Sequence, residues 1–171
     1  MARSTTLSPP LYVVDTSYLW ELVNCGEEKN SPACEKVRGL FKKAQAAHAR
    51  LYVPMPCLFE LANHIAKVKH DARRKKLADW LFDSVVKSLE ERVPWIITPA
   101  GDPKTILSEL LQTFRNQVVK KGIGLVDLFA ASEAKRLKKE HSDRNTNVHI
   151  WTNERALKAM EPDPEGNPFL W

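Results

Sequence analysis

The chain has 171 residues, the size of a single domain that buries enough surface to fold without disulfide bonds. Hydrophobic residues make up 43% and charged residues 27%, which excludes a wholly disordered chain, and no apolar run is long enough to span a membrane. Lysine and arginine exceed aspartate and glutamate by 26 to 21, a formal charge of +5. This excess is compatible with a polyanionic partner but identifies none.

The first ten residues lack the apolar segment of a secretory signal, and Cys25, Cys34 and Cys57 form no C-x-x-C pair. We therefore expect neither a disulfide framework nor a structural zinc site. The prediction is three ordinary thiols in a reducing compartment, and thus a cytoplasmic protein with no membrane partner.

Short runs of β-branched residues alternate with segments of helical periodicity along the chain. Buried strands are predicted at 11–15, 51–53, 95–97 and 148–152. Helices are predicted at about 32–49, 57–68, 71–91, 103–118, 125–137 and 155–160. This alternation predicts an α/β fold with a mainly parallel central sheet. Residues 1–10 are expected to be an extension and 161–171 an irregular tail, whose apolar residues 169–171 could pack back onto the domain.

Four acidic residues fall where the carboxyl ends of parallel strands would bring them together. Asp15 ends the first strand and Glu154 follows the last, while Glu60 and Asp127 lie near the starts of two helices. Ligands of open parallel sheets bind beyond these strand ends. Asp15 could instead simply cap the helix that follows it, an alternative that its neighbours Thr16 and Ser17 leave open.

Glu60 and Asp127 stand in apolar surroundings, Cys-Leu-Phe-Glu-Leu-Ala and Gly-Leu-Val-Asp-Leu-Phe-Ala-Ala, with no lysine or arginine three or four residues away. A buried carboxylate needs a partner, so a bound cation is the favoured interpretation. Hard oxygen ligands select Mg²⁺ or Mn²⁺ over zinc, and such a centre can polarise a phosphodiester and activate a water molecule.

Four sequence blocks, in order, resemble the PIN domain. They are Val-Val-Asp15-Thr-Ser-Tyr-Leu, Pro-Cys-Leu-Phe-Glu60-Leu-Ala-Asn, Gly-Leu-Val-Asp127-Leu-Phe-Ala-Ala and Ile-Trp-Thr152-Asn-Glu154-Arg-Ala-Leu. The resemblance spans residues 11–160 and implies a three-layer α/β/α sandwich and a metal-dependent ribonuclease. The PIN family includes the VapC-type toxins of toxin–antitoxin pairs.

The resemblance also implies roles for individual residues. Asp15, Glu60 and Asp127 match the first three acids of the family, and Glu154 stands where the family usually has Asp in a Thr-x-Asp pattern. Glu154 would then bind the metal directly or through water, or Asn153 would substitute in part. Residues expected to support the ligands by hydrogen bonds are Ser17, Thr152, Asn153 and Asn63, with His64 either supporting or structural.

A basic segment follows the helix that carries Glu60. It holds six lysines and arginines and one aspartate within ten residues: Lys67, Lys69, Arg73, Arg74, Lys75 and Lys76, with Asp71. It is interpreted either as a surface that tracks RNA phosphates or as a solvated helix junction. A second cluster at 135–139 is interpreted either as a further phosphate-tracking surface or as cations that stabilise the C-terminus of the helix carrying Asp127. Trp20, Trp80 and Trp151 occupy patterned apolar positions and are expected in the core rather than as stacking platforms.

The leading hypothesis is a Mg²⁺- or Mn²⁺-dependent endoribonuclease that uses these four acids. The resemblance implies RNA as a partner, with an antitoxin protein and a second copy of the chain as further candidates. The alternative is a catalytically weak PIN-like module that binds RNA or protein, which the Glu154 departure favours. A phosphotransfer domain of the haloacid-dehalogenase type also has an Asp after its first strand, but Asp15-Thr-Ser lacks the second Asp that this pattern requires.

Overall fold

The computed structural model describes residues 8–24, 32–98, 103–118, 122–142 and 145–165. Its strands are β1 (Leu11–Val14), β2 (Arg50–Pro54), β3 (Ile96–Thr98) and β4 (Val148–Trp151). The helices are α1 (Thr16–Asn24), α2 (Pro32–Ala46), α3 (Met55–Ala66), α4 (Asp71–Glu91), α5 (Pro103–Thr113), the π-helical η1 (Phe114–Val118), α6 (Leu125–Glu140) and α7 (Arg155–Lys158). Among the described residues, no helix is both long and apolar enough to cross a membrane.

The four strands form one sheet in the order β3-β2-β1-β4, and each neighbouring pair runs parallel. The chain leaves β1 and builds β2 and β3 on one side of it, then returns to add β4 on the other side. The strand order therefore reverses between β1 and β4, which is the position where open α/β sheets bind their ligands. The predicted α/β fold with a parallel sheet is confirmed.

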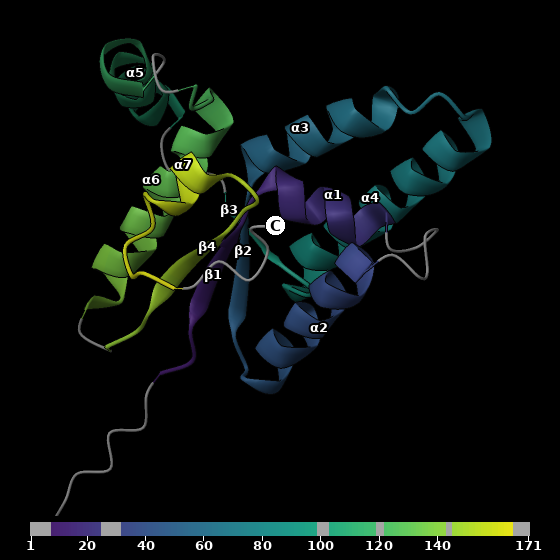
Figure 1. The fold of residues 1–171 in the computed structure, drawn as a ribbon, viewed down its shortest axis with the longest axis horizontal. Helices are drawn as coiled ribbons and strands as arrows, with labels where there is room; N and C mark the ends of the chain where they lie inside the picture. Colours follow the sequence, from purple (N-terminus) through teal and green to yellow (C-terminus); the bar gives the residue numbers. More distant parts are fainter. Residues whose placement is uncertain (1–7, 25–31, 99–102, 119–121, 143–144, 166–171) are drawn as a thin grey trace, which may run out of the picture.

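Helices cover both faces of the sheet, as Figure 1 shows, with α1–α4 on one side and α5–α7 on the other. Because side chains alternate along a strand, Val14 of β1 faces the first layer, while Leu11 and Val13 face the second. On the second face the small residues Ala130, Ala131 and Ala134 bring α6 close to the sheet. This three-layer α/β/α arrangement agrees with the predicted sandwich.

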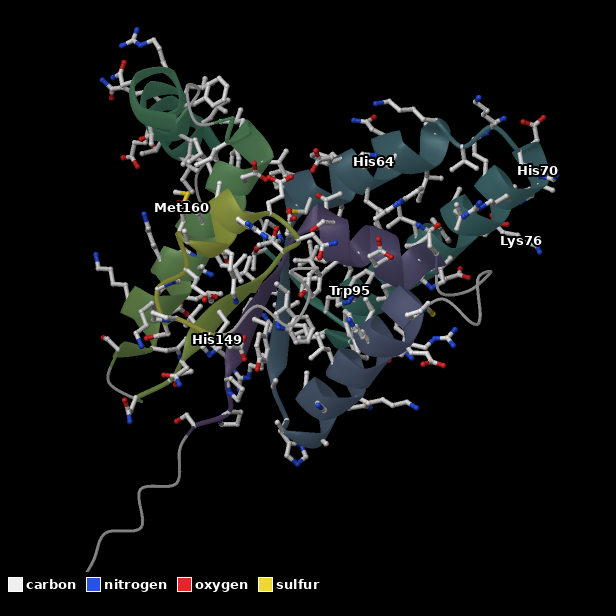
Figure 2. All side chains as sticks on the ribbon, viewed as in Figure 1. His64, His70, Lys76, Trp95, His149 and Met160 are labelled. Carbon is white, nitrogen blue, oxygen red and sulfur yellow. The ribbon has the colours of Figure 1, made fainter. Side chains whose placement is uncertain are left out.

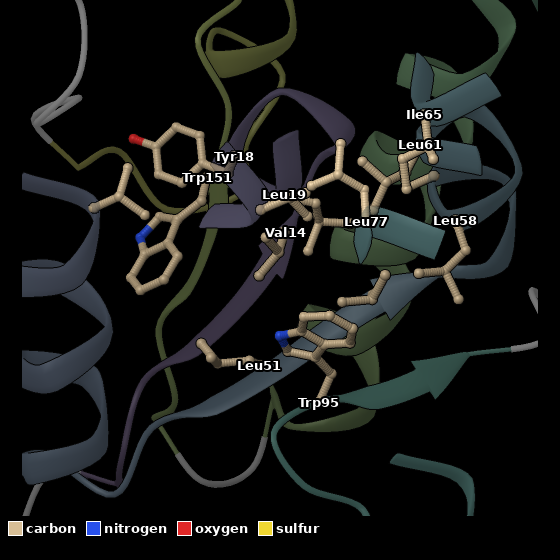
Figure 3. Close-up of a cluster of buried hydrophobic side chains, with 14 of the residues drawn as sticks. Val14, Tyr18, Leu19, Leu51, Leu58, Leu61, Ile65, Leu77, Trp95 and Trp151 are labelled. Carbon is tan, nitrogen blue, oxygen red and sulfur yellow. The ribbon is translucent and has the colours of Figure 1, made fainter. Parts of the chain in front are cut away.

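The larger hydrophobic core lies between the sheet and α1–α4 (Figure 3). Its side chains come from all four of these helices and include Tyr18, Leu19, Leu61 and Leu77. Trp151 packs there against Phe41, with ring centroids 5.2 Å apart. Both helices that leave the strand ends next to the predicted site, α1 and α3, are thus anchored by fully buried side chains.

The structure differs from the expected elements in several places. Helix α1, which the sequence patterns did not single out, begins directly after Asp15, and the helix predicted through residue 118 changes from α to π geometry at Phe114. Cys57 is a buried free thiol, whereas Cys34 is disulfide-bonded. The prediction of three ordinary thiols is therefore wrong, because sequence spacing alone does not show which cysteines lie close in space.

The described part of the tail, residues 161–165, is irregular as expected and packs on the outer edge of β4. The Val148 N–H donates to Asp163 Oδ2 at 2.8 Å, and the Ile150 N–H donates to Glu161 Oε2 at 3.0 Å. Buried Lys158 joins the two segments through Glu161 and the Ile150 carbonyl. Acidic side chains thus satisfy backbone groups that an edge strand would otherwise expose. The expectation for residues 169–171 lies outside the described residues.

Candidate functional site

A cavity of about 570 Å³ opens at the carboxyl ends of β1 and β4, where the strand order reverses. Four sequence-predicted acids from four separate segments line it: Asp15, Glu60, Asp127 and Glu154. The sheet explains part of this convergence, because the Asp15 N–H donates to the Trp151 carbonyl at 3.0 Å and so aligns the ends of the two strands. The segments that follow β1 and β4 therefore begin side by side.

Asp15 is the most buried of these acids, with 3% of its surface exposed. Its Oδ2 accepts hydrogen bonds from Ser17 Oγ at 2.8 Å, Thr152 Oγ1 at 3.0 Å and the Ser17 N–H at 3.3 Å. The last of these bonds is the capping contact that the alternative interpretation expected, so Asp15 both caps α1 and lines the cavity. Two hydroxyl groups and the start of a helix thus fix the orientation of this carboxylate.

Asp127 and Glu60 enter the cavity from the first turns of two helices. Asp127 is partly buried, and its Oδ2 accepts the Gly124 N–H at 2.7 Å. A Cβ at Gly124 would lie 3.2 Å from that oxygen, so a larger residue there would crowd the carboxylate. Glu60 lies on the second turn of α3, partly buried, and none of the described residues forms a hydrogen bond or ion pair with its carboxylate.

The segment after β4 is tied to Asp15 by a second set of bonds. The Asn153 N–H donates to Ser17 Oγ, and the Glu154 N–H donates to Thr152 Oγ1, each at 3.0 Å. The predicted positions of Ser17 and Thr152 next to Asp15 therefore agree with their contacts. The amide oxygen of Asn153 is buried without a hydrogen-bond partner and belongs to a residue that lines the cavity.

The electrostatics of the cavity are unusual because none of the described lysines, arginines or histidines forms an ion pair with the four acids. Burial raises the pKa of Asp15, against hydrogen bonds from Ser17, Thr16 and Thr152 that lower it. Burial and then the nearby carboxylates raise the pKa of both Asp127 and Glu154. Ionising all of these groups together costs free energy that a bound cation would recover.

The donor set suits a hard divalent cation, since it offers carboxylate oxygens and an unpartnered amide oxygen, with Cys57 buried outside the cavity lining. In the described part of the chain, however, no three Asp, Glu, His or Cys side chains are grouped closely enough to hold a metal ion as they stand. A metal would therefore require the longer side chains, Glu60 and Glu154, to turn toward the two aspartates.

Other predicted residues lie away from the cavity. Asn63 is exposed and does not line it, whereas His64, one position further along α3, does. None of the six basic residues from Lys67 to Lys76 lines it either. They occupy the end of α3, the turn and the start of α4, where Figure 2 shows Lys76 and His70 far from the sheet. Arg74 pairs there with Asp71, and Lys75 pairs with Asp79.

The sequence interpretation missed two residues of α1 that line the cavity, Trp20 and Glu21. Each lies four positions after a residue already at the site, Trp20 after Thr16 and Glu21 after Ser17, so both share that face of the helix. Trp20 packs against the core as expected, but it is only partly buried, and its ring lies 5.6 Å from that of His64. Trp80 and Trp151 do pack in the core.

Comparisons with known proteins add a weak structural likeness. No family model and no curated protein sequence matches the chain. Among solved structures, the chain is similar to one from the crystal structure of VapBC2 from Rickettsia felis bound to a DNA fragment from their promoter. The match has 19% sequence identity and a TM-score of 0.44, and it covers 83% of this chain and 99% of the other. A likeness of this size does not establish a shared activity, so the functional argument rests on the cavity itself.

Proposed function

We propose that the chain is a Mg²⁺- or Mn²⁺-dependent endoribonuclease that hydrolyses phosphodiester bonds at the acidic cavity. The observation that carries this proposal is the meeting of Asp15, Glu60, Asp127 and Glu154 in one cavity at the strand-order reversal. Their charges have no cationic partner among the described residues. Structural carboxylates are ordinarily paired, and acids left unpaired in a cavity are candidates for function.

Each side chain has a distinct part in this proposal. Asp15 and Asp127 would bind the metal directly, because they are the shorter and more firmly oriented carboxylates. Glu60 and Glu154 would hold the metal and orient the attacking water from more exposed positions. Ser17 and Thr152 orient Asp15 and favour its ionised form by donating hydrogen bonds to it. When bound, the metal supplies charge stabilisation at the phosphodiester and a more acidic water molecule.

The choice of RNA as substrate rests on the resemblance of the four sequence blocks to the PIN domain. The same resemblance supports a role as the toxin of a toxin–antitoxin pair, with an antitoxin protein as partner and a homodimer as the assembly. The cavity chemistry supports phosphodiester hydrolysis in general. These finer assignments are therefore proposals that cleavage and partner experiments have to test.

The decisive experiment is cleavage of single-stranded RNA by the purified protein in Mn²⁺, in Mg²⁺ and in EDTA. We expect cleavage with either metal and none in EDTA. Asp15→Asn should abolish cleavage while the protein stays folded, as judged by circular dichroism. Glu60→Gln is the second variant, because no described residue forms a hydrogen bond or ion pair with that carboxylate, so its loss cannot unfold the chain by breaking a contact. Full activity in both variants would overturn the assignment.

A second candidate is a PIN-like module that binds RNA or protein without cutting it. The observation in its favour is that no three ligating side chains of the described residues are grouped for a metal, together with Glu154 at the position where the family usually has Asp. Calorimetric titration with Mn²⁺ separates the two candidates. Binding at micromolar to low millimolar metal supports the nuclease, and no heat at several millimolar supports the module.

A further inference from the structure

The acidic cavity has an aromatic wall that the proposed chemistry does not use. Trp20 of α1 and His64 of α3 both line it, with ring centroids 5.6 Å apart and an angle of 43° between their planes. His64 is exposed and Trp20 is partly buried, so flat ring surface is available at the cavity. Figure 2 shows His64 on α3, whereas His70 lies further out, at the outer end of the α3–α4 pair.

Each ring lies one helical turn beyond residues that line the acidic site. Trp20 lies one helical turn beyond Thr16 and Ser17, and His64 lies one turn beyond Glu60 on the same face of α3. Both helices start at the carboxyl ends of neighbouring strands, β1 and β2. A chain whose phosphate sits over the carboxylates would therefore place an adjacent group over the rings.

The acidic charge of the cavity explains why an aromatic wall would help to bind a nucleic acid. The residues that line it include five acids, counting Glu21, but none of the described lysines or arginines. A polyanionic strand consequently gains no attraction from side-chain cations at the site itself, and even a bound divalent ion leaves the lining acidic. A contact that does not depend on charge would add binding energy here, and stacking of a base on aromatic rings supplies one.

The available space favours an unpaired base. A cavity of about 570 Å³ lies within the range of sites that enclose one small molecule. In a duplex both faces of a base are covered by its neighbours, so stacking on a side chain requires a base that is splayed out. We propose that Trp20 and His64 form a stacking platform for one unpaired base beside the scissile phosphate, which makes single-stranded RNA or a loop the substrate; this rests on the proposed function.

The test measures binding apart from cleavage. The parent is the Glu60→Gln variant in EDTA, and the probes are fluorescein-labelled octamers of oligoadenylate, of abasic ribose phosphate and of duplex RNA. Trp20→Leu keeps an apolar side chain but removes the ring, and Trp20→Phe restores a ring. We expect Trp20→Leu and His64→Ala each to weaken oligoadenylate binding by about 10- to 100-fold, and Trp20→Phe to retain most of it. Binding of the abasic probe should be weak and unchanged in all variants.

His70→Ala is the matched control for His64→Ala, because His70 is an exposed histidine outside the cavity lining. The platform is contradicted if Trp20→Leu binds oligoadenylate as well as its parent, if the abasic or duplex probe binds as tightly as the single strand, or if no probe binds. Cleavage by the unmodified protein in Mn²⁺ is scored separately. A protein that cuts RNA but ignores the ring substitutions loses only this inference, whereas one that stacks bases without cutting loses only the nuclease.

Discussion

Helix α3 joins an acidic region and a basic region that differ in burial and in how their charges are paired. Near its start, Glu60 lines a cavity with Asp15, Asp127 and Glu154, and none of the described residues pairs with these acids as a cation. At its end, the basic segment lies on an exposed turn and helix start, where two of its six cations pair with local aspartates. Hydroxyl and backbone N–H donors hold the acidic side chains in place, whereas solvent and neighbouring carboxylates surround the basic side chains.

The cavity is a region where carboxylates repel one another, whereas the basic segment is an ordinary solvated surface. Exposed ion pairs such as Lys75–Asp79 contribute little to stability and need no ligand to complete them. Carboxylates whose pKa values are raised by burial and by one another are more costly when ionised, and a cation would relieve them. Chemistry is therefore expected at the start of α3, and at most weak guidance of a polyanion at its end.

The largest predicted effect comes from neutralising an acid in the cavity. Asp127→Asn keeps an oxygen to accept the Gly124 N–H but loses a metal ligand, so RNA cleavage should fall at least about 100-fold. Removing one of several repelling charges should also raise the thermal stability of the metal-free protein slightly, by less than about 1 kcal/mol after solvent screening. Asp83→Asn, on exposed α4, is the control and should change neither cleavage nor stability.

Much of the fold and of the acidic site could be predicted from the sequence, because apolar residues recur with the periods of strands and helices. The strands and the helices predicted at 71–91 and 125–137 follow apolar patterns, and Glu60 and Asp127 stand out because they interrupt such patterns. Once the sheet was taken as parallel, strand ends placed Asp15 and Glu154 together without further information. The fold class and the meeting of the four acids were thus predictable.

The sequence did not show the direction in which individual side chains point or how far a long helix extends from the site. Asn63 and His64 are neighbours on α3, yet only His64 lines the cavity, because one residue turns a helix by about 100°. The basic segment follows Glu60 closely in sequence, but a straight helix carries it away from the site. Trp20 also fits a core pattern, and only the packing of α1 against α3 shows that one part of its surface meets the cavity.

The basic segment provides the next test. Lys67, Lys69 and Lys76 are exposed and form no ion pair with described residues, so replacing all three with alanine leaves the fold intact. If they contact phosphates, RNA affinity at low salt should fall about 10-fold, and the slope of log affinity against log salt should shrink by up to about 2. Filter binding across salt concentrations measures both quantities, with Lys42→Ala and Lys43→Ala on α2 as controls. An unchanged slope identifies the segment as a solvated junction.

The pH dependence of stability should differ between the cavity and the tail. Asp15, Asp127 and Glu154 have raised pKa values when folded, so the folded protein binds more protons than the unfolded chain just above about pH 4. Their contribution to stability therefore falls as pH rises through the raised values. For Asp163, hydrogen bonds from Lys138 and the Val148 N–H outweigh burial and lower the pKa, so its contribution is lost instead as pH falls below about 4.

Urea unfolding of the metal-free protein and of its Asp15→Asn variant, compared above about pH 4, isolates the cavity, because Asp163 and the histidines are common to both proteins. We expect the free energy of unfolding to decline as pH rises above about 4, and millimolar Mn²⁺ to offset the decline. The Asp15→Asn variant should show a flatter profile. A stability that rises over this range, or that ignores Mn²⁺, would mean that the acids are not under the electrostatic strain described here.

The smallest predicted effect concerns the hydroxyl that ties the cavity together. Ser17 Oγ donates to Asp15 Oδ2 and accepts the Asn153 N–H, so Ser17→Ala removes both bonds at once. The helix favours alanine, which offsets part of the loss, and unfolding free energy should drop by about 0.5 to 1 kcal/mol. Because that bond favours the ionised carboxylate, its removal raises the pKa of Asp15 further, and Mn²⁺ binding should become more sensitive to acid. Ser108 of α5 is exposed and lacks these contacts, so Ser108→Ala should leave both properties unchanged. A Ser17→Ala variant that behaves like it would show that Thr152 and the backbone N–H of residue 17 are enough to orient Asp15.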